Sequence, residues 1–267
     1  MNIGQQILRW SAAAGVVAAG SALTPVVHAA DPADKAETEI ASPWSGSAAL
    51  GFVASGGNTS SRSQNAEYTL KYAGADWVFS SAGKLVQQRS DVTIEAADGS
   101  TREESQTTAE NYRVDLRTER RVDAANYLFG QAAFVKDLFG AVRTSTSQTV
   151  GYGRRLIARD TTALDLEIGA GARQEEEQTS RETNSEAIGQ LALRLDTRLG
   201  ERASVKQLLR VESGSDNTVT DSQTRMRLSV IGSLWAQLGF DLRHNSQTGP
   251  NESSTDTITS ISLLWEF

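Results

Sequence analysis

The chain lacks cysteine altogether, and its 267 residues include only four prolines and two histidines. Without cysteine there are no disulfides, no thiolate metal sites and no lipid-modified N-terminal cysteine. Three of the prolines precede residue 44, so nearly all of the remaining chain is free of a residue that interrupts a β-ladder. No long uncharged apolar run follows residue 29, which argues against a spanning helix there. The net charge of −7 disfavours nucleic acid as a partner.

The first 29 residues have the pattern of a secretory signal peptide. Arg9 is their only charged side chain, an apolar stretch follows it, and Val27-His28-Ala29 has the small-x-small pattern of a cleavage site. The apolar stretch is short and rich in Ala and Gly, so a retained helical anchor is the weaker alternative. Residues 30–43 are small, polar and charged, and we expect a flexible periplasmic lead-in.

The C-terminus supplies the clearest strand. Large apolar residues alternate with others up to the last position, at Ile261, Leu263, Trp265 and Phe267. Alternation with a period of two predicts a β-strand with one apolar face. An aromatic residue that closes such a strand resembles the signal read by the machinery that assembles outer-membrane barrels, so these four residues are the expected assembly signal.

The region 44–267 divides into segments of roughly ten residues that are separated by turn residues, which is typical of a transmembrane β-barrel. The clearest alternating segments are 44–52, 66–72, 112–117, 164–170, 191–198, 225–230 and 234–243. Weaker segments lie near 77–88, 126–136, 144–158, 203–212 and 256–267. The sequence therefore predicts an all-β, antiparallel transmembrane barrel of about twelve strands, an even number. A soluble β-sandwich is the alternative, since its strands also have one apolar face.

Short and long connections alternate along the chain, as they do in outer-membrane barrels with tight periplasmic turns and extended outer loops. Short connections are expected at 74–76, 122–125, 159–161, 200–202 and 232–233. Long ones are expected at 55–63, 89–108, 137–143, 173–185, 213–220 and 244–254. This alternation places both termini in the periplasm. An aromatic girdle is expected at the same rim, made of Trp44, Tyr72, Trp77, Tyr127, Trp235 and Trp265.

Four short motifs resemble a known family. They are Trp44-Ser45-Gly46, the turn Ser55-Gly56-Gly57-Asn58-Thr59, Val135-Lys136-Asp137 and Gly151-Tyr152-Gly153, together with the aromatic C-terminus. The chain resembles the YdiY-like family of salt-induced outer-membrane proteins, a domain of unknown function. The resemblance implies an outer-membrane barrel and a link to salt or osmotic stress. It carries over no catalytic or ligand residues.

Residues that carry chemistry are scarce. His244 is the only histidine beyond the leader, and a loop histidine in a polar run is a better interpretation than a catalytic base. Two acidic clusters, around Glu175-Glu176-Glu177 and around Glu103-Glu104, match no calcium-loop spacing and are interpreted as solvated loops rather than cation sites. We therefore expect no enzyme activity, no cofactor and no metal.

The lumen is the most informative region. By the parity of the strands, the residues expected to line it are Lys71, Arg113, Asp115, Arg117, Asp165, Glu167, Arg194, Asp196, Arg198, Arg225, Arg227, Asp241 and Arg243. Parity also places Glu67, Lys84, Glu119, Arg155, Lys206, Arg210, Glu212 and Glu266 there. So many charges cannot lie unpaired in a dry interior, so the lumen must hold water, dense ion pairs or both. The inward majority of cations predicts a weak preference for anions.

Two functions remain open at this point. One is a narrow passive channel for ions or small solutes, and the other is a closed barrel that supports the envelope or presents its loops to partners. The expected partners are outer-membrane lipid, lipopolysaccharide and the barrel assembly machinery. The sequence does not indicate an oligomeric state.

Overall fold

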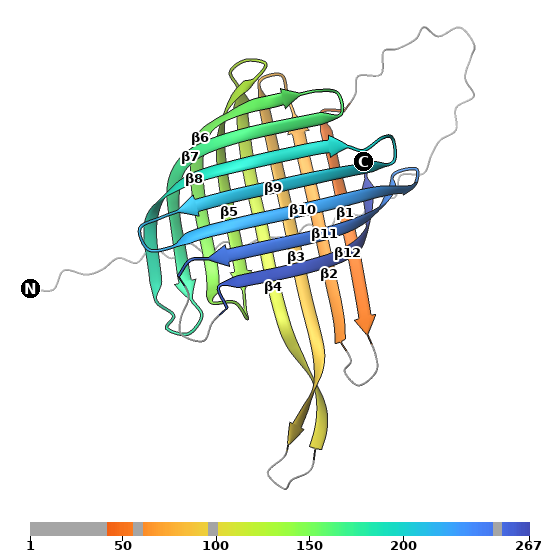
Figure 1. The fold of residues 1–267 in the computed structure, drawn as a ribbon, viewed down its shortest axis with the longest axis vertical. Helices are drawn as coiled ribbons and strands as arrows, with labels where there is room; N and C mark the ends of the chain where they lie inside the picture. The colour runs from red at the N-terminus through yellow and green to blue at the C-terminus, as the bar shows by residue number, and fades with distance from the viewer. Residues whose placement is uncertain (1–41, 56–60, 96–100, 248–252) are drawn as a thin grey trace, which may run out of the picture. The chain divides into compact units, whose positions relative to one another are not determined.

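In the computed structural model, the described residues are 42–55, 61–95, 101–247 and 253–267, and they form a closed barrel of twelve antiparallel strands (Figure 1). Each strand pairs with its neighbours in sequence, and β1 pairs with β12 to close the barrel. The strands are β1 (Trp44–Ser55), β2 (Ser61–Ala73), β3 (Trp77–Glu95), β4 (Thr101–Arg121), β5 (Asn126–Asp137), β6 (Val142–Ala158), β7 (Thr162–Glu177), β8 (Thr183–Arg198), β9 (Ala203–Ser213), β10 (Thr218–Ile231), β11 (Leu234–Asn245) and β12 (Thr255–Glu266).

The predicted fold class and the number of strands are confirmed. The described residues contain no helix with the length and apolar character needed to cross a membrane. The expected signal peptide, nearly all of the lead-in and most of the Ser55–Thr59 turn lie outside the described residues.

The pairing register gathers one row of each strand on the outside of the barrel. Leu193, for example, is flanked by Leu166 on β7 and Leu209 on β9, and all three side chains are exposed. On the other face of the same strands, Arg194 pairs with Asp165 of β7. Because successive side chains of a strand point to opposite faces, a one-residue alternation in sequence becomes an apolar outer wall and a charged interior.

The hairpin β3–β4 corrects one expectation. Residues 89–108 were expected to form a long loop, but the ladder between the two strands continues to the pair Glu95↔Thr101, with a bulge at Gln88/Arg89. Figure 1 shows this hairpin, in yellow, extending beyond its neighbours. Its distal half is mostly polar in sequence, and the short alternation of Val92 and Ile94 on β3 has no apolar counterpart at Thr101–Thr108 of β4, so the sequence gives little indication of a strand there.

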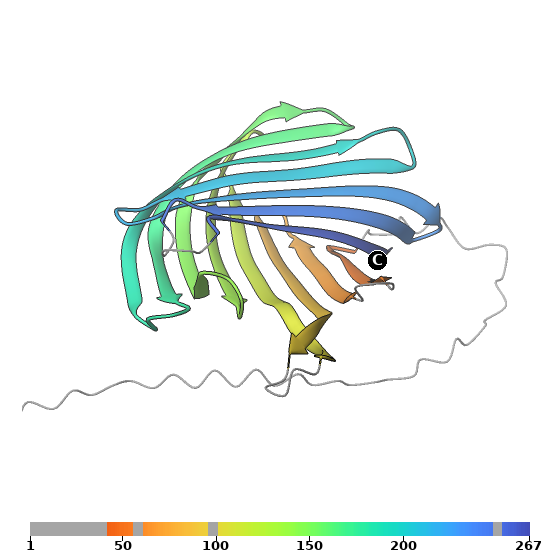
Figure 2. The same cartoon turned by 60° about the horizontal axis from the view of Figure 1, so that its bottom comes forward.

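The junction between β1 and β12, called the seam below, is the shortest pairing of the barrel. It runs only from Ser47↔Glu266 to Leu50↔Leu263, with further backbone hydrogen bonds between Gly46 and Phe267. By contrast, β1 pairs with β2 over its whole length. Beyond the seam, β1 and β12 diverge, as Figures 1 and 2 show.

The short connections use ordinary turn chemistry. Gly200 and Gly232 adopt positive φ angles of 76° and 54°, which side chains with a Cβ rarely adopt. In the β4–β5 turn, Asp123 accepts hydrogen bonds from the Asn126 side chain and from the backbone N–H of Ala125. These bonds lower the pKa of Asp123, because they favour its charged form. The stabilisation of the turn is therefore present at neutral pH and is lost as the pH falls through this lowered pKa.

Candidate functional site: the charged interior

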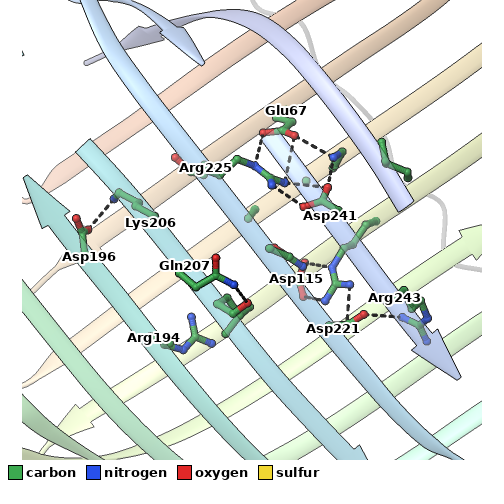
Figure 3. Close-up of a pocket in the computed structure, with 18 of the residues that line it drawn as sticks. Glu67, Asp115, Arg194, Asp196, Lys206, Gln207, Asp221, Arg225, Asp241 and Arg243 are labelled. Atoms are coloured by element: carbon green, nitrogen blue, oxygen red, sulfur yellow. Dashed lines mark hydrogen bonds and ion pairs between the residues drawn. The ribbon is translucent and has the colours of Figure 1, made fainter. Parts of the chain in front are cut away.

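A cavity of about 540 Å³ lies inside the barrel. Its lining includes Lys71 and Lys206 near the end with the short turns, and Asp137 and Asp256 near the end with the long connections. Nine cationic and nine acidic side chains contribute to it in total. Figure 3 shows several of them joined by ion pairs. The cavity thus reaches from one end of the strands to the other between charged walls.

Glu167 is the centre of one ion-pair cluster, and its side chain is fully buried (0% exposed). It accepts hydrogen bonds from Arg117 Nη2 at 2.7 Å and from the Tyr127 hydroxyl at 2.8 Å, and Arg194 Nε lies 2.9 Å from the same oxygen. Arg117 also pairs with Glu119 at 2.6 Å. Because Arg117 is on β4 and Glu167 on β7, this cluster ties together strands that are not neighbours in the sheet.

Tyr127 therefore lies in the interior and does not belong to the aromatic girdle, which corrects that expectation. A Cβ built on Gly153 would lie 2.2 Å from Tyr127 Cζ, and one on Gly151 would lie 2.6 Å from Phe129 Cζ. The two glycines of β6 thus leave room for the two rings of β5. On the other side, the guanidinium of Arg117 lies 4.4 Å from the centroid of the Phe129 ring, a cation–π contact. This packing explains why the Gly151-Tyr152-Gly153 motif has glycine at its first and last positions.

A second cluster bridges the two walls next to the seam. Lys84 of β3 pairs with Asp241 of β11 and lies 3.3 Å from Glu67 Oε1 of β2. Arg225 of β10 donates to Asp241 at 3.1 Å and lies 3.4 Å from Glu67. Gln237 donates to Glu67 at 2.9 Å. These contacts join β2 and β3 to β10 and β11 across the interior side of the seam, and Figure 3 shows Glu67, Arg225 and Asp241 joined in this way.

A third cluster crosses the lumen at Asp221. Arg210 of the neighbouring strand donates to it at 2.6 Å, whereas Arg113 reaches it from β4, on the far side of the barrel, at 3.5 Å. Arg243 approaches the second carboxylate oxygen at 3.5 Å. Arg113 also donates to Asp115 at 2.7 Å. Three arginines thus share one carboxylate, and the contact between β4 and β10 crosses the lumen.

Arg173 forms a fourth cluster near the long connections, and parity did not place it among the lumen residues. Its side chain is 1% exposed, pairs with Glu186 and lies 3.5 Å from Glu175 and 3.8 Å from Glu212. It also donates to the carbonyl of Asn217 at 2.7 Å. Residues 173–185 were expected to form an outer loop, but β7 and β8 extend through most of them. Continuing the inward parity of Asp165 and Glu167 along β7 reaches Arg173 and Glu175, which is the signal that would have found them.

The residues expected to line the lumen occupy three kinds of position. Glu167 and Arg117 are in the interior but are packed in the wall, away from the cavity. Arg198 is exposed at the end of β8 and does not line the cavity. The others contribute to its lining: Lys71, Arg113, Asp115, Asp165, Arg194, Asp196, Arg225, Arg227, Asp241 and Arg243. Lys206 and Asp196, 3.0 Å apart and about half exposed, mark the more open part near the short turns.

The aromatic residues at the short-turn end form a partial girdle. Trp44 packs edge-on against Tyr72 with ring centroids 5.0 Å apart, and Trp265 lies 5.1 Å from Phe267. Ile261, Leu263, Trp265 and Phe267 all point outward and are exposed. The expected place of Trp235 in the girdle is also wrong. Trp235 pairs with Leu264, which is 1% exposed and faces the interior. Trp235 therefore lies on the inner face of β11.

His244 makes a hydrogen-bonding contact of 2.9 Å between its Nδ1 and the Thr255 hydroxyl, at the start of β12. His244 lies on the outer face of β11, as do Leu242 and Phe240. Within the described ranges, no group of three or more potential metal-ligating side chains comes together.

A closed antiparallel barrel with an apolar outer wall and a charged interior is the architecture of outer-membrane β-barrel proteins. The chain belongs to the family described as "Protein of unknown function, DUF481", which it matches over residues 48–267. It is 25% identical over 224 residues to the uncharacterized protein YdiY of Escherichia coli (strain K12), an alignment that covers 83% of this chain and 82% of that protein. The resemblance noted from the sequence motifs is thereby confirmed.

Among solved structures, the chain is similar to the NanC porin, with a TM-score of 0.45 and 8% identity over 82% of this chain and 97% of the porin. It is also similar to the KdgM porin, with a TM-score of 0.44 and 7% identity over 84% and 99% of the two chains. These likenesses concern the general fold.

Proposed function

We propose that this protein spans the outer membrane and acts as a narrow passive channel for ions or small solutes. The observation that carries the proposal is the interior cavity, whose lining residues come from both ends of the strands. Its walls carry nine cationic and nine acidic side chains, and charged walls favour water and small ions over apolar solutes. The diameter of a barrel grows with its number of strands. The lumen of a twelve-stranded barrel is therefore wider than the filled interior of an eight-stranded barrel and narrower than the open channel of a sixteen-stranded one.

The orientation is part of this proposal. The apolar outer wall would face the acyl chains, and the short turns and both termini would lie in the periplasm, after removal of a signal peptide at residues 1–29. The outward row Ile261, Leu263, Trp265 and Phe267 would be read by the barrel assembly machinery. Lipopolysaccharide would surround the end with the longer connections. The link with salt or osmotic stress rests on the family resemblance.

Selectivity between anions and cations should be weak. The inward cations outnumbered the acids in the set predicted from strand parity, but the cavity lining is balanced, because Asp137, Asp221 and Asp256 also contribute. The clusters at Asp221 and Asp241 would set the conductance, since they narrow the passage. Ion pairs next to cavity water weaken with ionic strength, so conductance should rise more steeply than the bulk conductivity of the salt.

A closed structural barrel is the second candidate, and one observation favours it. The Arg113–Asp221 contact joins opposite walls, and the Lys84–Asp241 contact joins the two walls that flank the seam. In this candidate the pairs never open to a passing ion, and the charges only brace the wall.

Single-channel recording of the refolded protein in planar bilayers separates the two candidates. The channel proposal expects small conductance steps for the wild type and larger steps for the double variant Arg113→Gln/Asp221→Asn, which removes a contact across the lumen. The matched control is Arg155→Gln/Asp165→Asn, because this pair joins the adjacent strands β6 and β7. No steps from either the wild type or the double variant, with the protein folded in the membrane, would leave the closed barrel as the function.

A further inference from the structure

The outer wall carries an apolar groove near the short-turn end, with a volume of about 500 Å³. Its floor is made of the small outward residues Ser81, Thr118, Gly130 and Ala132, on three consecutive strands. Larger apolar side chains stand around the floor: Trp44, Leu70, Phe79 and Leu116. The register explains the hollow, because Phe79, Thr118 and Gly130 are cross-strand neighbours and two of the three are small.

A cationic group lies directly beside this groove. Arg120 is two residues beyond Thr118 on the same face of β4, a separation of about 7 Å along a strand. Its guanidinium lies 5.8 Å from the centroid of the Trp77 ring, and Trp77 stacks on Phe79 at 6.1 Å. Arg120 is exposed, and among the described residues no carboxylate lies within ion-pair distance of it. An outward arginine with an aromatic neighbour and no acidic partner has donors free for an anion.

We propose that this groove binds one anionic phospholipid, with an acyl chain along the small residues and the headgroup phosphate on Arg120. Two properties of the site favour this occupant over other apolar molecules. The groove is apolar along its length. Arg120, which is exposed two residues beyond the lining residue Thr118, offers a guanidinium, the group best suited to a phosphate. An amphiphile with one anionic end matches both. The inference rests on the proposed location in the outer membrane, whose periplasmic leaflet would hold the site.

Other parts of the outward rows carry large side chains, such as Leu166, Leu193 and Leu209 on neighbouring strands. At Gly130 a Cβ would meet only Thr118 Cγ2, at 3.5 Å, which is an ordinary contact. A larger residue at position 130 therefore fits the backbone and fills the groove. Gly189 of β8, on the same outer wall, has nothing within 4 Å of such a Cβ and supplies a matched control.

The test uses the refolded full chain in detergent with phosphatidylglycerol or phosphatidylcholine added, and native mass spectrometry measures the fraction that retains one lipid. We expect Gly130→Leu to reduce retention of both lipids at least tenfold, and Gly189→Leu to leave it unchanged. Arg120→Gln should reduce retention of phosphatidylglycerol about fivefold and leave phosphatidylcholine unchanged. Arg154→Gln, an exposed outward arginine on β6 away from the groove, is the control for charge.

Equal retention by wild type and Gly130→Leu would overturn the proposal, and so would equal losses in Arg120→Gln and Arg154→Gln. Ala132→Leu fills the same groove from its neighbouring floor position and replaces Gly130→Leu if that variant does not fold. Folding is read from the shift of the unboiled band on gels. The two proposals can fail separately. A barrel that retains the lipid but shows no conductance contradicts the channel proposal and leaves the lipid site standing.

Discussion

The ring of Phe267 lies over the α-carbon of Gly46, where the last strand of the barrel meets the first. A Cβ on Gly46 would lie 2.5 Å from Phe267 Cζ and 2.8 Å from the carbonyl oxygen of Thr69. The two residues also exchange backbone hydrogen bonds of 2.9 and 3.0 Å. The glycine of the opening motif and the terminal aromatic residue are thus two halves of one contact that closes the barrel.

Replacing Gly46 with Val should weaken this closure. The new side chain displaces both the Phe267 ring and the Thr69 backbone, at a cost of about 1–3 kcal/mol for an overpacked site. We expect a lower fraction of heat-modifiable protein after refolding and a lower unfolding midpoint in urea. Phe267→Ala should lose less, because it removes only the ring contact. If Gly46→Val refolds like the wild type, the contact does not stabilise the closed barrel.

Glu167 should be the most sensitive acidic residue of the interior. Glu167→Leu leaves Arg117 and Arg194 without their shared carboxylate, and breaking a buried ion pair in this way costs about 3–5 kcal/mol. Tyr127→Phe removes only one hydrogen bond to the same group, at a cost of about 1–2 kcal/mol. Urea unfolding of the two variants in lipid vesicles measures both values. A smaller loss for Glu167→Leu than for Tyr127→Phe contradicts this assignment.

The glycines beneath the interior rings should not tolerate side chains. In Gly153→Val the Tyr127 ring must move, so its hydroxyl loses Glu167 and the cluster loosens. The expected result is a drop in the unfolding midpoint at least as large as that of Tyr127→Phe. Gly189→Val is the control, since nothing surrounds a Cβ at that position. Equal unfolding midpoints for Gly153→Val and Gly189→Val would contradict this prediction, because the Tyr127 ring would then have a second position of similar energy.

The seam should open before the other ladders. In hydrogen exchange followed by mass spectrometry, peptides from residues 51–55 and 255–262 should exchange faster than peptides from the middle of β7 and β8. The reason is that these stretches extend beyond the seam and lack pairing to each other, whereas β7 and β8 pair along nearly their whole length. Uniform protection around the barrel contradicts this prediction.

The architecture could be predicted because the outer wall leaves a strong trace in the sequence. The row Leu234, Ala236, Leu238, Phe240 and Leu242 gives the period of β11 directly. In the distal halves of β3 and β4 the sequence is mostly polar, and the same backbone pairing leaves no sustained apolar row. The sequence then resembles a loop, and the extent of the hairpin could not be predicted.

The interior was harder to predict, since parity gives the face of a side chain but not its partner. Tyr127 illustrates this limit. An aromatic residue at a strand end is typical of a girdle, but the glycines of the neighbouring strand β6 leave room for the Tyr127 ring inside the barrel. The contact of Arg113 with Asp221 joins strands that are far apart in the sequence. Nothing local in either strand indicates which residues will meet across the lumen.

The brief meeting of β1 and β12 bears on how the chain folds. All other strand pairs join neighbours in sequence and can form as hairpins. The pair of β1 and β12 joins residues more than two hundred positions apart, so it can form only after the intervening strands have come together. Until then both edge strands expose unpaired backbone groups, which invite pairing with other chains. Ring closure is thus the step at which a nascent molecule is most exposed to aggregation, and a helper that holds the free edge of β12 would protect it.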